Sequence, residues 1–254
     1  MIIFSIGRSI SDFTKVALNT PPIAPPGKKA VYSNVGWAIA GLIAEIAANS
    51  TYENLLQEKI FNPPGMKNSK IGKWPASNTE PDQPRGHYSK EALYKGSTRT
   101  EKPVAQKLDD KYVFPDWMNP AGGVHCSIED YGLYARENLL GLQGKWILLD
   151  KDAYSTIHSI QSTSSLKQMF SHSEVFKNIK KDIKVTMGYG WSVTPDGKNL
   201  ISGSDGSGGT FFARLVIYPP FNVAFAGFTN CGNGNSALDE VIERISGFKW
   251  NTSM

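Results

Sequence analysis

Apolar residues recur at helical spacing along the first part of the chain and alternate with polar residues after Met187. The helical spacing predicts helices at 13–18, 35–48, 52–60, 128–140 and 148–160. The helix at 35–48 is apolar nearly all round, so we expect it to be buried. The alternating pattern predicts strands at 188–194, 200–204, 211–218 and 223–228, followed by a helix at 235–245. Helices, then an antiparallel meander, then a covering helix make an α+β layout.

Short motifs mark where several of these elements begin and end. Ser50–Glu53 and Ser127–Asp130 have the form of capping boxes, which predict helix starts. Asn62–Gly65 predicts a helix stop. Residues 67–118 are polar and proline-rich. A stretch this long usually has a function or carries additional structural elements, rather than being a simple loop between two elements. Hairpin connections are predicted at Pro195–Gly197 and Pro219–Asn222.

Composition removes several classes of protein. The 254 residues carry a net charge of +4 without a concentrated basic block, which argues against a nucleic-acid binder. No apolar run approaches the ~20 residues of a membrane span. Cys126 and Cys231 cannot define a disulfide framework, and the histidines show no metal-ligand spacing. Met1–Ile6 lacks the basic start of a signal peptide, so the sequence leaves the compartment open.

Tyr32-Ser33-Asn34 is the first candidate for chemistry. A phenol and an amide two residues apart can point into one site from a loop at a helix N-terminus, where the helix dipole favours a tyrosinate. A tyrosinate can act as a general base, and an amide can hold a substrate carbonyl. The structural alternative is an aromatic core residue followed by an asparagine N-cap.

The second candidate is the glycine-rich stretch from Ser202 to Thr210. Backbone N–H groups near such glycines can hold an oxyanion at a strand edge, although glycines also mark an ordinary hairpin corner. His125-Cys126 is a weaker candidate for a Cys/His nucleophile, because neighbours in sequence rarely face each other.

Six segments, in order, resemble landmarks of the serine β-lactamase, penicillin-binding protein and esterase superfamily, on its class C-like side. The similarity extends over residues 20–248. The first segment, 25–37, contains a Tyr-x-Asn motif, and the second, Ile60–Met66, is similar to Pro-Leu-Gly-Met with Pro64 in place of Leu. The third, Pro120–Ser127, is similar to Pro-Ala-Gly-Gly, and the fourth, Tyr189–Trp191, matches a Tyr-Gly-Trp strand. The fifth, Gly203–Phe211, matches the family's last motif, and the sixth comprises the two strands behind it, with Tyr218-Pro219 and Phe228–Asn230.

The resemblance implies an acyl-transfer site without a metal or cofactor. In this family a serine attacks an amide or ester carbonyl, and a lysine three residues later and the tyrosine of Tyr-x-Asn handle its proton. The resemblance assigns Tyr32 as the general base and Asn34 as the residue that orients the substrate. It further assigns the third wall of the site to Ser204, Asp205 and Gly206, and the oxyanion donor to the backbone N–H of Ser207.

Two departures from the family pattern change what we expect. Only 31 residues precede Tyr32, and none of them forms the Ser-x-x-Lys motif that carries the nucleophile. Ser164 and Lys167 have this spacing but follow Tyr-x-Asn, so we interpret the match as a coincidence. Ser204 stands where the family has Lys or His, which makes carboxylate-bearing substrates less expected and suits a neutral ester or amide.

The family's N-terminal segment supplies two strands beside the strand at 223–228 and the helix of the nucleophile. The resemblance therefore implies one N-terminally truncated β-lactamase/transpeptidase-like domain over 1–254. Within it we expect a mainly helical lobe with long loops over 35–187, and antiparallel strands with a C-terminal helix over 188–248. A bare apolar sheet edge invites pairing with another chain, so we expect a marginal or self-associating protein.

Three functions stay open at this point. The first is a serine acyl hydrolase acting on a small ester, amide or peptide, inactive here because the nucleophile is absent. The second is a non-catalytic relative, a pseudoenzyme that binds peptide or glycan fragments in the same site. The third is a purely structural or interaction domain.

Overall fold

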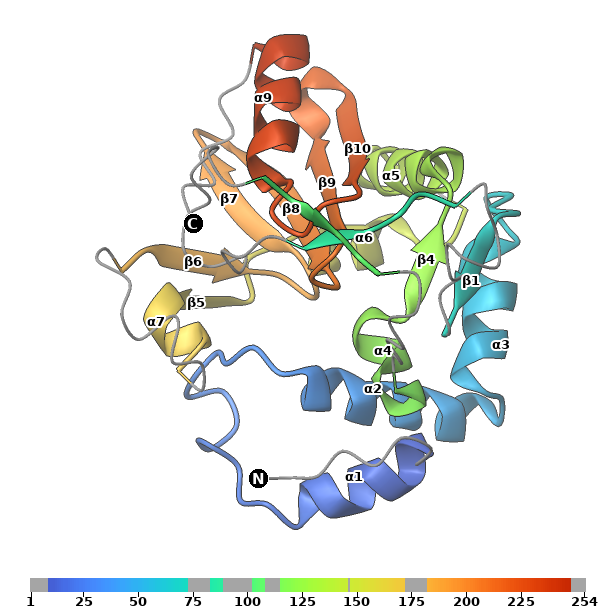
Figure 1. The fold of residues 1–254 in the computed structure, drawn as a ribbon. Helices are drawn as coiled ribbons and strands as arrows, with labels where there is room; N and C mark the ends of the chain where they lie inside the picture. The colour runs from blue at the N-terminus through green and yellow to red at the C-terminus, as the bar shows by residue number, and fades with distance from the viewer. Residues whose placement is uncertain are drawn as a thin grey trace.

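The structure is a computed structural model that describes residues 9–72, 83–88, 102–107, 115–145, 147–171 and 182–247. In these residues an antiparallel sheet has a helix on each face and stands beside a group of helices (Figure 1). The α+β layout predicted from the periodicity is confirmed. No helix in these ranges is long and apolar enough to cross a membrane.

The main sheet contains six strands in the described ranges, in the order β10-β9-β8-β7-β6-β5. Their bounds are β5 Ser162–Ser165, β6 Lys184–Met187, β7 Ser192–Asp196, β8 Asn199–Ser207, β9 Phe212–Tyr218 and β10 Val223–Thr229. The last four correspond to predicted strands, but β5 and β6 were not predicted. Ser162–Ser165 is entirely polar and shows no alternation, so nothing in its pattern indicates a strand. The boundary expected at 187/188 therefore falls inside the sheet.

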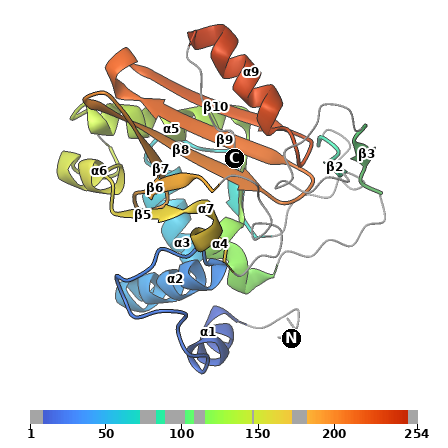
Figure 2. The same cartoon turned by 90° about the vertical axis from the view of Figure 1, so that its left-hand side faces the viewer.

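Two helices cover opposite faces of this sheet (Figure 2). Helix α5 (Ile128–Leu142) packs Ala135 and Leu139 onto Trp191, Val193, Leu215 and Ile217. Helix α9 (Asn235–Ser246) packs Ile242 onto Ile201, Val216 and Tyr218 on the other face. Because side chains of a strand alternate between faces, each residue of β8 and β9 belongs to the α5 face or the α9 face.

Most of the remaining helices form a separate group below the sheet (Figure 1). They are α1 Ile10–Leu18, α2 Asn34–Ala48, α3 Tyr52–Leu56, η1 Gln57–Phe61, η2 Asp116–Met118 and α4 Asn119–Gly122. Phe13 of α1 stacks on Trp117 of η2 at 3.7 Å between ring centroids, beside Ala38 of α2. The expectation that α2 is buried all round is wrong for this structure, because Trp37, Ile43 and Ile46 are exposed. The described residues cover only one face of this apolar helix.

Short elements connect the larger ones. They are β1 Ser69–Ile71 paired with β4 Val124–Cys126, β2 His87–Tyr88 paired with β3 Val104–Ala105, α6 Lys151–Ile157, α7 Leu166–Met169 and η3 Pro219–Phe221. The cap predicted at Ser127 is confirmed, because its Oγ accepts from the Asp130 N–H at 3.3 Å. The start predicted at Ser50 is displaced by one residue. Thr51 caps α3 instead, by accepting from the Asn54 N–H at 3.2 Å.

Candidate functional site

Tyr32 lies in an extended segment just ahead of α2 and is 43% exposed. Its backbone N–H donates to the Met169 carbonyl at 2.9 Å, and its ring stacks on Phe170 at 5.2 Å between centroids. The backbone bond and the ring contact together hold the segment against the end of α7. The alternative that Tyr32 is an aromatic core residue is therefore wrong.

Asn34 is the first residue of α2 but not its cap. Ser33 occupies the cap position, where its Oγ accepts from the Gly36 N–H at 3.0 Å. The alternative role for Asn34, an asparagine N-cap, is therefore taken by its neighbour. The Asn34 amide lies at the N-terminal end of α2, where the helix dipole is positive and favours negative charge.

The turn Tyr189–Trp191 between β6 and β7 touches the start of α2. The Cβ of an alanine at Gly190 would lie 3.5 Å from the Trp37 ring atom Cη2, so this turn contacts the first helical turn after Asn34. Immediately after the turn, Ser192 pairs with Gly203 of β8. The Tyr-Gly-Trp turn therefore connects the Tyr-x-Asn segment to the strand that carries Ser204.

The glycine-rich segment occupies the end of β8 and the turn that follows. Ser204 is half-buried and pairs with Leu215, which places its side chain on the α5 face. Ser207 ends the strand, where its Oγ accepts from the Gly209 N–H at 3.1 Å and donates to the Phe211 carbonyl at 3.0 Å. These two bonds hold the turn that follows the predicted oxyanion donor.

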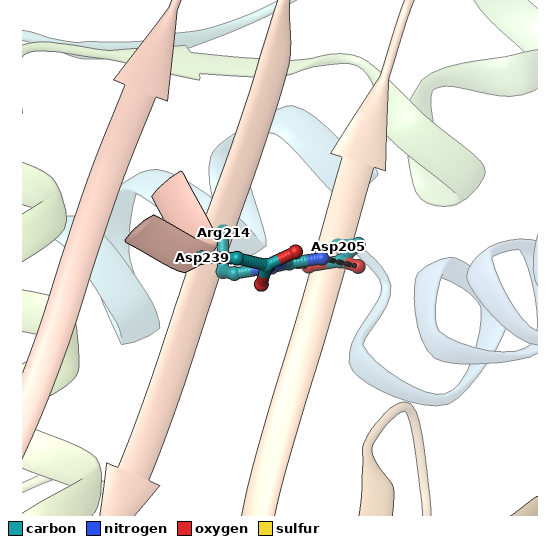
Figure 3. Close-up of polar contacts among 3 residues, drawn as sticks. All are labelled: Asp205, Arg214 and Asp239. Carbon is teal, nitrogen blue, oxygen red and sulfur yellow. Dashed lines mark hydrogen bonds and ion pairs between the residues drawn. The ribbon is translucent and has the colours of Figure 1, made fainter. Parts of the chain in front are cut away.

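Asp205 points to the opposite face from Ser204 and belongs to an ion-pair cluster (Figure 3). Both of its carboxylate oxygens accept from Arg214, each at 2.8 Å, and Arg214 also bonds Asp239 of α9. Burial would lower the pKa of the Arg214 guanidinium, but the two carboxylates outweigh this and raise it. The Asp205 side chain therefore connects β8 to β9 and α9. The part of Asp205 that can line a wall on the α5 face is its backbone.

A segment that sequence reasoning missed braces the glycine-rich turn. The His87 N–H donates to the Thr210 carbonyl at 3.1 Å, and the His87 carbonyl accepts from the Gly232 N–H at 3.1 Å. A Cβ at Gly232 would lie 2.1 Å from the Gly209 oxygen, so only glycine allows this approach. His87 belongs to the polar stretch 67–118, which was expected to have a function or to carry additional structure. That stretch shows no periodic pattern that would indicate this contact.

The Beta-lactamase family model matches residues 7–246. The chain belongs to the Beta-lactamase family. No curated protein sequence matches it significantly.

Solved structures show the same fold at low identity. A D-amino acid amidase from Ochrobactrum anthropi SV3 is 18% identical with a TM-score of 0.67, covering 97% of this chain and 66% of its own. A penicillin-binding protein from Bacillus halodurans is 16% identical with a TM-score of 0.64, covering 94% and 62%. An octameric penicillin-binding protein homologue from Pyrococcus abyssi is 19% identical with a TM-score of 0.60, covering 88% and 44%. The chain thus spans between 44% and 66% of the length of these structures, and the β-lactamase-like fold expected from its motifs is confirmed.

The Ser164–Lys167 motif does not have the form of this family's nucleophile. Ser164 lies in β5, is 7% exposed, and donates through its Oγ to the neighbouring Ser165 carbonyl at 3.4 Å. Lys167 lies in α7, and its backbone N–H donates to Asp182 Oδ1 at 3.0 Å. Serine and lysine therefore belong to different elements, rather than to one nucleophile helix as in the family. The placement agrees with our interpretation of this match as a coincidence.

His125 and Cys126 are successive residues of β4, a strand whose side chains alternate in direction. Burial, and secondarily the nearby Asp130, raise the pKa of the Cys126 thiol to about 12. A thiol that stays protonated is a poor nucleophile. In the described ranges no cluster of three or more His, Cys, Asp or Glu side chains is placed to hold a metal ion.

The raised pKa predicts slow alkylation of Cys126. In the folded protein at pH 8, we expect iodoacetamide to modify Cys126 roughly a hundredfold or more slowly than a free cysteine, because little thiolate is present. Peptide mass spectrometry over time measures the rate, and the urea-unfolded chain provides the control at normal reactivity. Equal rates in the folded and unfolded states would contradict the prediction and restore the Cys/His hypothesis.

Proposed function

We propose that this chain carries the substrate-binding and proton-transfer part of a serine acyl hydrolase site, which acts on an amide or ester through an acyl-enzyme. Tyr32 is the general base and Asn34 orients the substrate carbonyl. Ser204, Asp205 and Gly206 form the third wall, and the Ser207 N–H donates to the oxyanion. Residues 1–254 act as one β-lactamase-related domain.

One observation carries the proposal. The Tyr189–Trp191 turn contacts Trp37 beside the Tyr-x-Asn segment, and its next residue pairs with Gly203 beside Ser204. Two segments about 170 residues apart, each matching a family motif, thereby meet the same short turn. This supports a shared site for Tyr32, Asn34 and Ser204, since unrelated surface segments would have no reason to converge there.

The side chains near this turn point to a substrate class. Tyr32, Trp37 and Tyr189 are all exposed aromatic residues, which suit an apolar or aromatic substrate group. Ser204 offers a hydroxyl where the family has a cation, so a neutral ester or amide fits better than a carboxylate. A similar structure, the Ochrobactrum amidase, is complexed with L-phenylalanine amide. We therefore propose small neutral amides or esters of aromatic amino acids as ligands.

The chain by itself is proposed to bind such ligands without turning them over. No Ser-x-x-Lys precedes Tyr32 in the sequence, and Ser164 is buried in β5. The absence of a Ser-x-x-Lys motif ahead of Tyr32 also favours a second function, a pseudoenzyme that binds peptide or glycan fragments in this site. The two functions predict the same behaviour for the chain alone and differ in whether a nucleophile is supplied to the site.

The experiment measures turnover and binding together. With p-nitrophenyl acetate, a chromogenic cephalosporin and D-phenylalanine amide, we expect no hydrolysis above background. D-Phenylalanine amide is expected to bind, as measured by NMR titration, and to bind more tightly than D-phenylalanine, which carries a carboxylate. Asn34→Ala is expected to weaken amide binding roughly two- to tenfold, the effect of one lost hydrogen bond. Asn54→Ala, on the exposed side of α3, is the matched control and should leave binding unchanged.

Each other outcome has a defined meaning. Robust hydrolysis that disappears in Tyr32→Phe would show that the chain supplies its own nucleophile. An acyl adduct on Ser164 in mass spectrometry would identify that nucleophile and overturn our interpretation of its motif. Absence of amide binding would overturn the proposed site and leave an interaction domain. For that third function we propose a partner as well, a second copy of the chain at the outer edge of the sheet.

A further inference from the structure

The Tyr-Gly-Trp turn is bound to the corner of the chain that follows α6. The Tyr189 N–H donates to the Ile157 carbonyl at 3.1 Å, and a Cβ at Gly188 would lie 2.4 Å from that same oxygen. One residue after Ile157, the His158 ring packs on the Trp191 ring at 4.4 Å between centroids. A backbone hydrogen bond and a ring contact therefore join this corner to the turn.

The hydrogen bonds around His158 fix which ring nitrogen carries its proton. The Asn138 amide nitrogen donates to the Tyr134 carbonyl at 2.8 Å, so the Asn138 side chain presents its Oδ1 to the ring. This oxygen lies 3.1 Å from His158 Nε2 and can only accept, so we assign the proton to Nε2. His158 Nδ1 is buried and has no hydrogen-bond partner among the described residues. The pocket therefore fits the neutral ring in one tautomer.

A second proton would have to bind Nδ1, where the described residues offer it no acceptor. His158 is 3% exposed, and burial lowers the pKa of its ring to about 4. An imidazolium in this pocket would be a buried cation with an unmet N–H donor, and both features cost free energy that contact with water recovers. Leaving the pocket removes this cost but separates the ring from Trp191. Acid therefore favours an arrangement in which the corner has left the turn.

The other ionisable groups on the surrounding elements have different partners. Burial raises the pKa of the phenols of Tyr134 on α5 and Tyr154 on α6, so both stay neutral in acid. The Glu137 carboxylate accepts from the Tyr154 hydroxyl at 2.7 Å and from two backbone N–H groups, rather than from His158. The Tyr189 phenol on the turn is exposed, as are the charged residues at the start of α6. His158 is thus the group here whose protonation the packing opposes.

We propose that His158 is a positioning residue for the amide site: its neutral ring holds the Tyr-Gly-Trp turn against the corner after α6, and a proton on the ring releases the turn. The inference rests on the proposed function, because the ligand binds beside this turn. The turn contacts Trp37 of α2, and the next residue, Ser192, pairs with Gly203 of β8. The held turn therefore keeps both segments of the site in place, and the released turn does not.

Hydrogen exchange at the Tyr189 amide measures the release, because its bond to the Ile157 carbonyl must break. Ile217, on an interior strand of the sheet, provides the reference for global unfolding. After correction for intrinsic rates, we expect Tyr189 to be less protected than Ile217 at pH 7. Its protection should fall about twentyfold from pH 7 to 5, the change expected for a pKa of 6.5 in the released turn and about 4 in the held turn.

Two variants test whether the ring causes this pH dependence. His158→Gln keeps an N–H donor for Asn138 but does not titrate, so its Tyr189 protection should show no comparable fall. Ser155→Gln, on the exposed side of α6, is the matched control and should retain the twentyfold fall. A measurement on the wild type covers the case in which His158→Gln does not fold. The ¹⁵N shifts of the His158 ring at pH 7 should show the proton on Nε2.

Ligand binding tests the coupling between the turn and the site. D-Phenylalanine amide at ten times its dissociation constant should slow exchange at Tyr189 about tenfold at pH 6, because it is expected to bind only the protein with the held turn. Its amino group is already charged at this pH, so the ligand itself does not titrate in more acidic solution. The NMR titration that measures the dissociation constant shows independently whether the ligand binds.

These results would overturn the proposal. Protection of Tyr189 equal to that of Ile217 at every pH means that the turn opens only when the whole protein unfolds. Protection that does not fall in acid, or that still falls in His158→Gln, removes the role of the ring. A proton on Nδ1 at pH 7 contradicts the assigned hydrogen bond. A ligand that binds without slowing exchange at Tyr189 separates the turn from the site.

The proposed function can fail separately from this inference. If D-phenylalanine amide does not bind at any pH, the amide site is wrong. Hydrogen exchange at Tyr189 and the tautomer of His158 are measured without a ligand, so they still decide whether this ring positions the turn.

Discussion

Replacing Arg214 with methionine is expected to lower the free energy of unfolding by about 3 kcal/mol or more. The Arg214 side chain is 2% exposed and is held by Asp205 and Asp239, whose side chains are 34% and 26% exposed. Without the guanidinium, the partly buried carboxylates of Asp205 and Asp239 lose the positive charge that both of them contact. Methionine fills much of the space but supplies neither the charge nor the hydrogen bonds of the guanidinium.

Urea unfolding measures the loss, and a conservative variant separates charge from geometry. Arg214→Lys keeps the charge but cannot bond both oxygens of Asp205 in parallel, so we expect an intermediate loss. Arg244→Met is the matched control, because Arg244 is 76% exposed and pairs with Glu240 within the same helix. It should change stability by no more than about 0.5 kcal/mol. A loss below about 1 kcal/mol in Arg214→Met would contradict the role assigned to this cluster.

Acid is expected to destabilise the protein well above the pH at which carboxylates titrate. Burial lowers the pKa of His158 from 6.5 to about 4. Its Nε2 contacts Asn138 Oδ1 at 3.1 Å, its ring packs on Trp191, and its Nδ1 has no hydrogen-bond partner among the described residues. Between pH 6.5 and 4 the unfolded chain binds a proton that the folded chain does not. Stability therefore falls as the pH falls through this window, by roughly 3 kcal/mol in total.

The slope of stability against pH, measured by urea unfolding from pH 7 to 4.5, tests this expectation. His158→Gln should flatten the slope, whatever its effect at pH 7, because glutamine does not titrate. Asp182, whose pKa is lowered mainly by hydrogen bonds from Lys167 and Ser165, contributes only below about pH 4. A slope that persists in His158→Gln would assign the pH dependence to other groups.

Much of the fold was predictable because many of its signals are local. Alternation identified β7 to β10, helical spacing identified α2, α5 and α9, and Ser127 marked the start of α5. The polar strand β5 was not predictable, since its place in the sheet comes from pairing with β6 rather than from its own pattern. The exposure of Ile43 and Ile46 was also unpredictable, because periodicity shows that a helix is apolar but not which faces have neighbours.

The candidate site likewise has one part that was predictable from the sequence and another part that only the structure shows. Motif order in the sequence was sufficient to single out Tyr32, Asn34 and the segment from Ser204 to Ser207, because chemistry of this kind needs particular residue types in a particular succession. Three features depended on contacts between separate elements of the fold. These are the turn at Gly190 that connects the two segments, the His87 brace on the glycine-rich turn, and the Arg214 cluster that takes the Asp205 carboxylate. An arginine inside an apolar strand was the one sequence signal of that cluster.

Residue type and spacing were therefore enough to predict the α+β class and the family, and to single out the residues proposed for chemistry, since these follow from local propensity and from motifs along the chain. The tertiary structure alone decided which face each strand residue occupies and which side chains are already committed to partners. Those properties depend on contacts between separate elements, such as those that join Gly86–His87 to Thr210 and Gly232. No local sequence pattern predicts such contacts, because the two partners lie in separate segments that meet only in the folded chain.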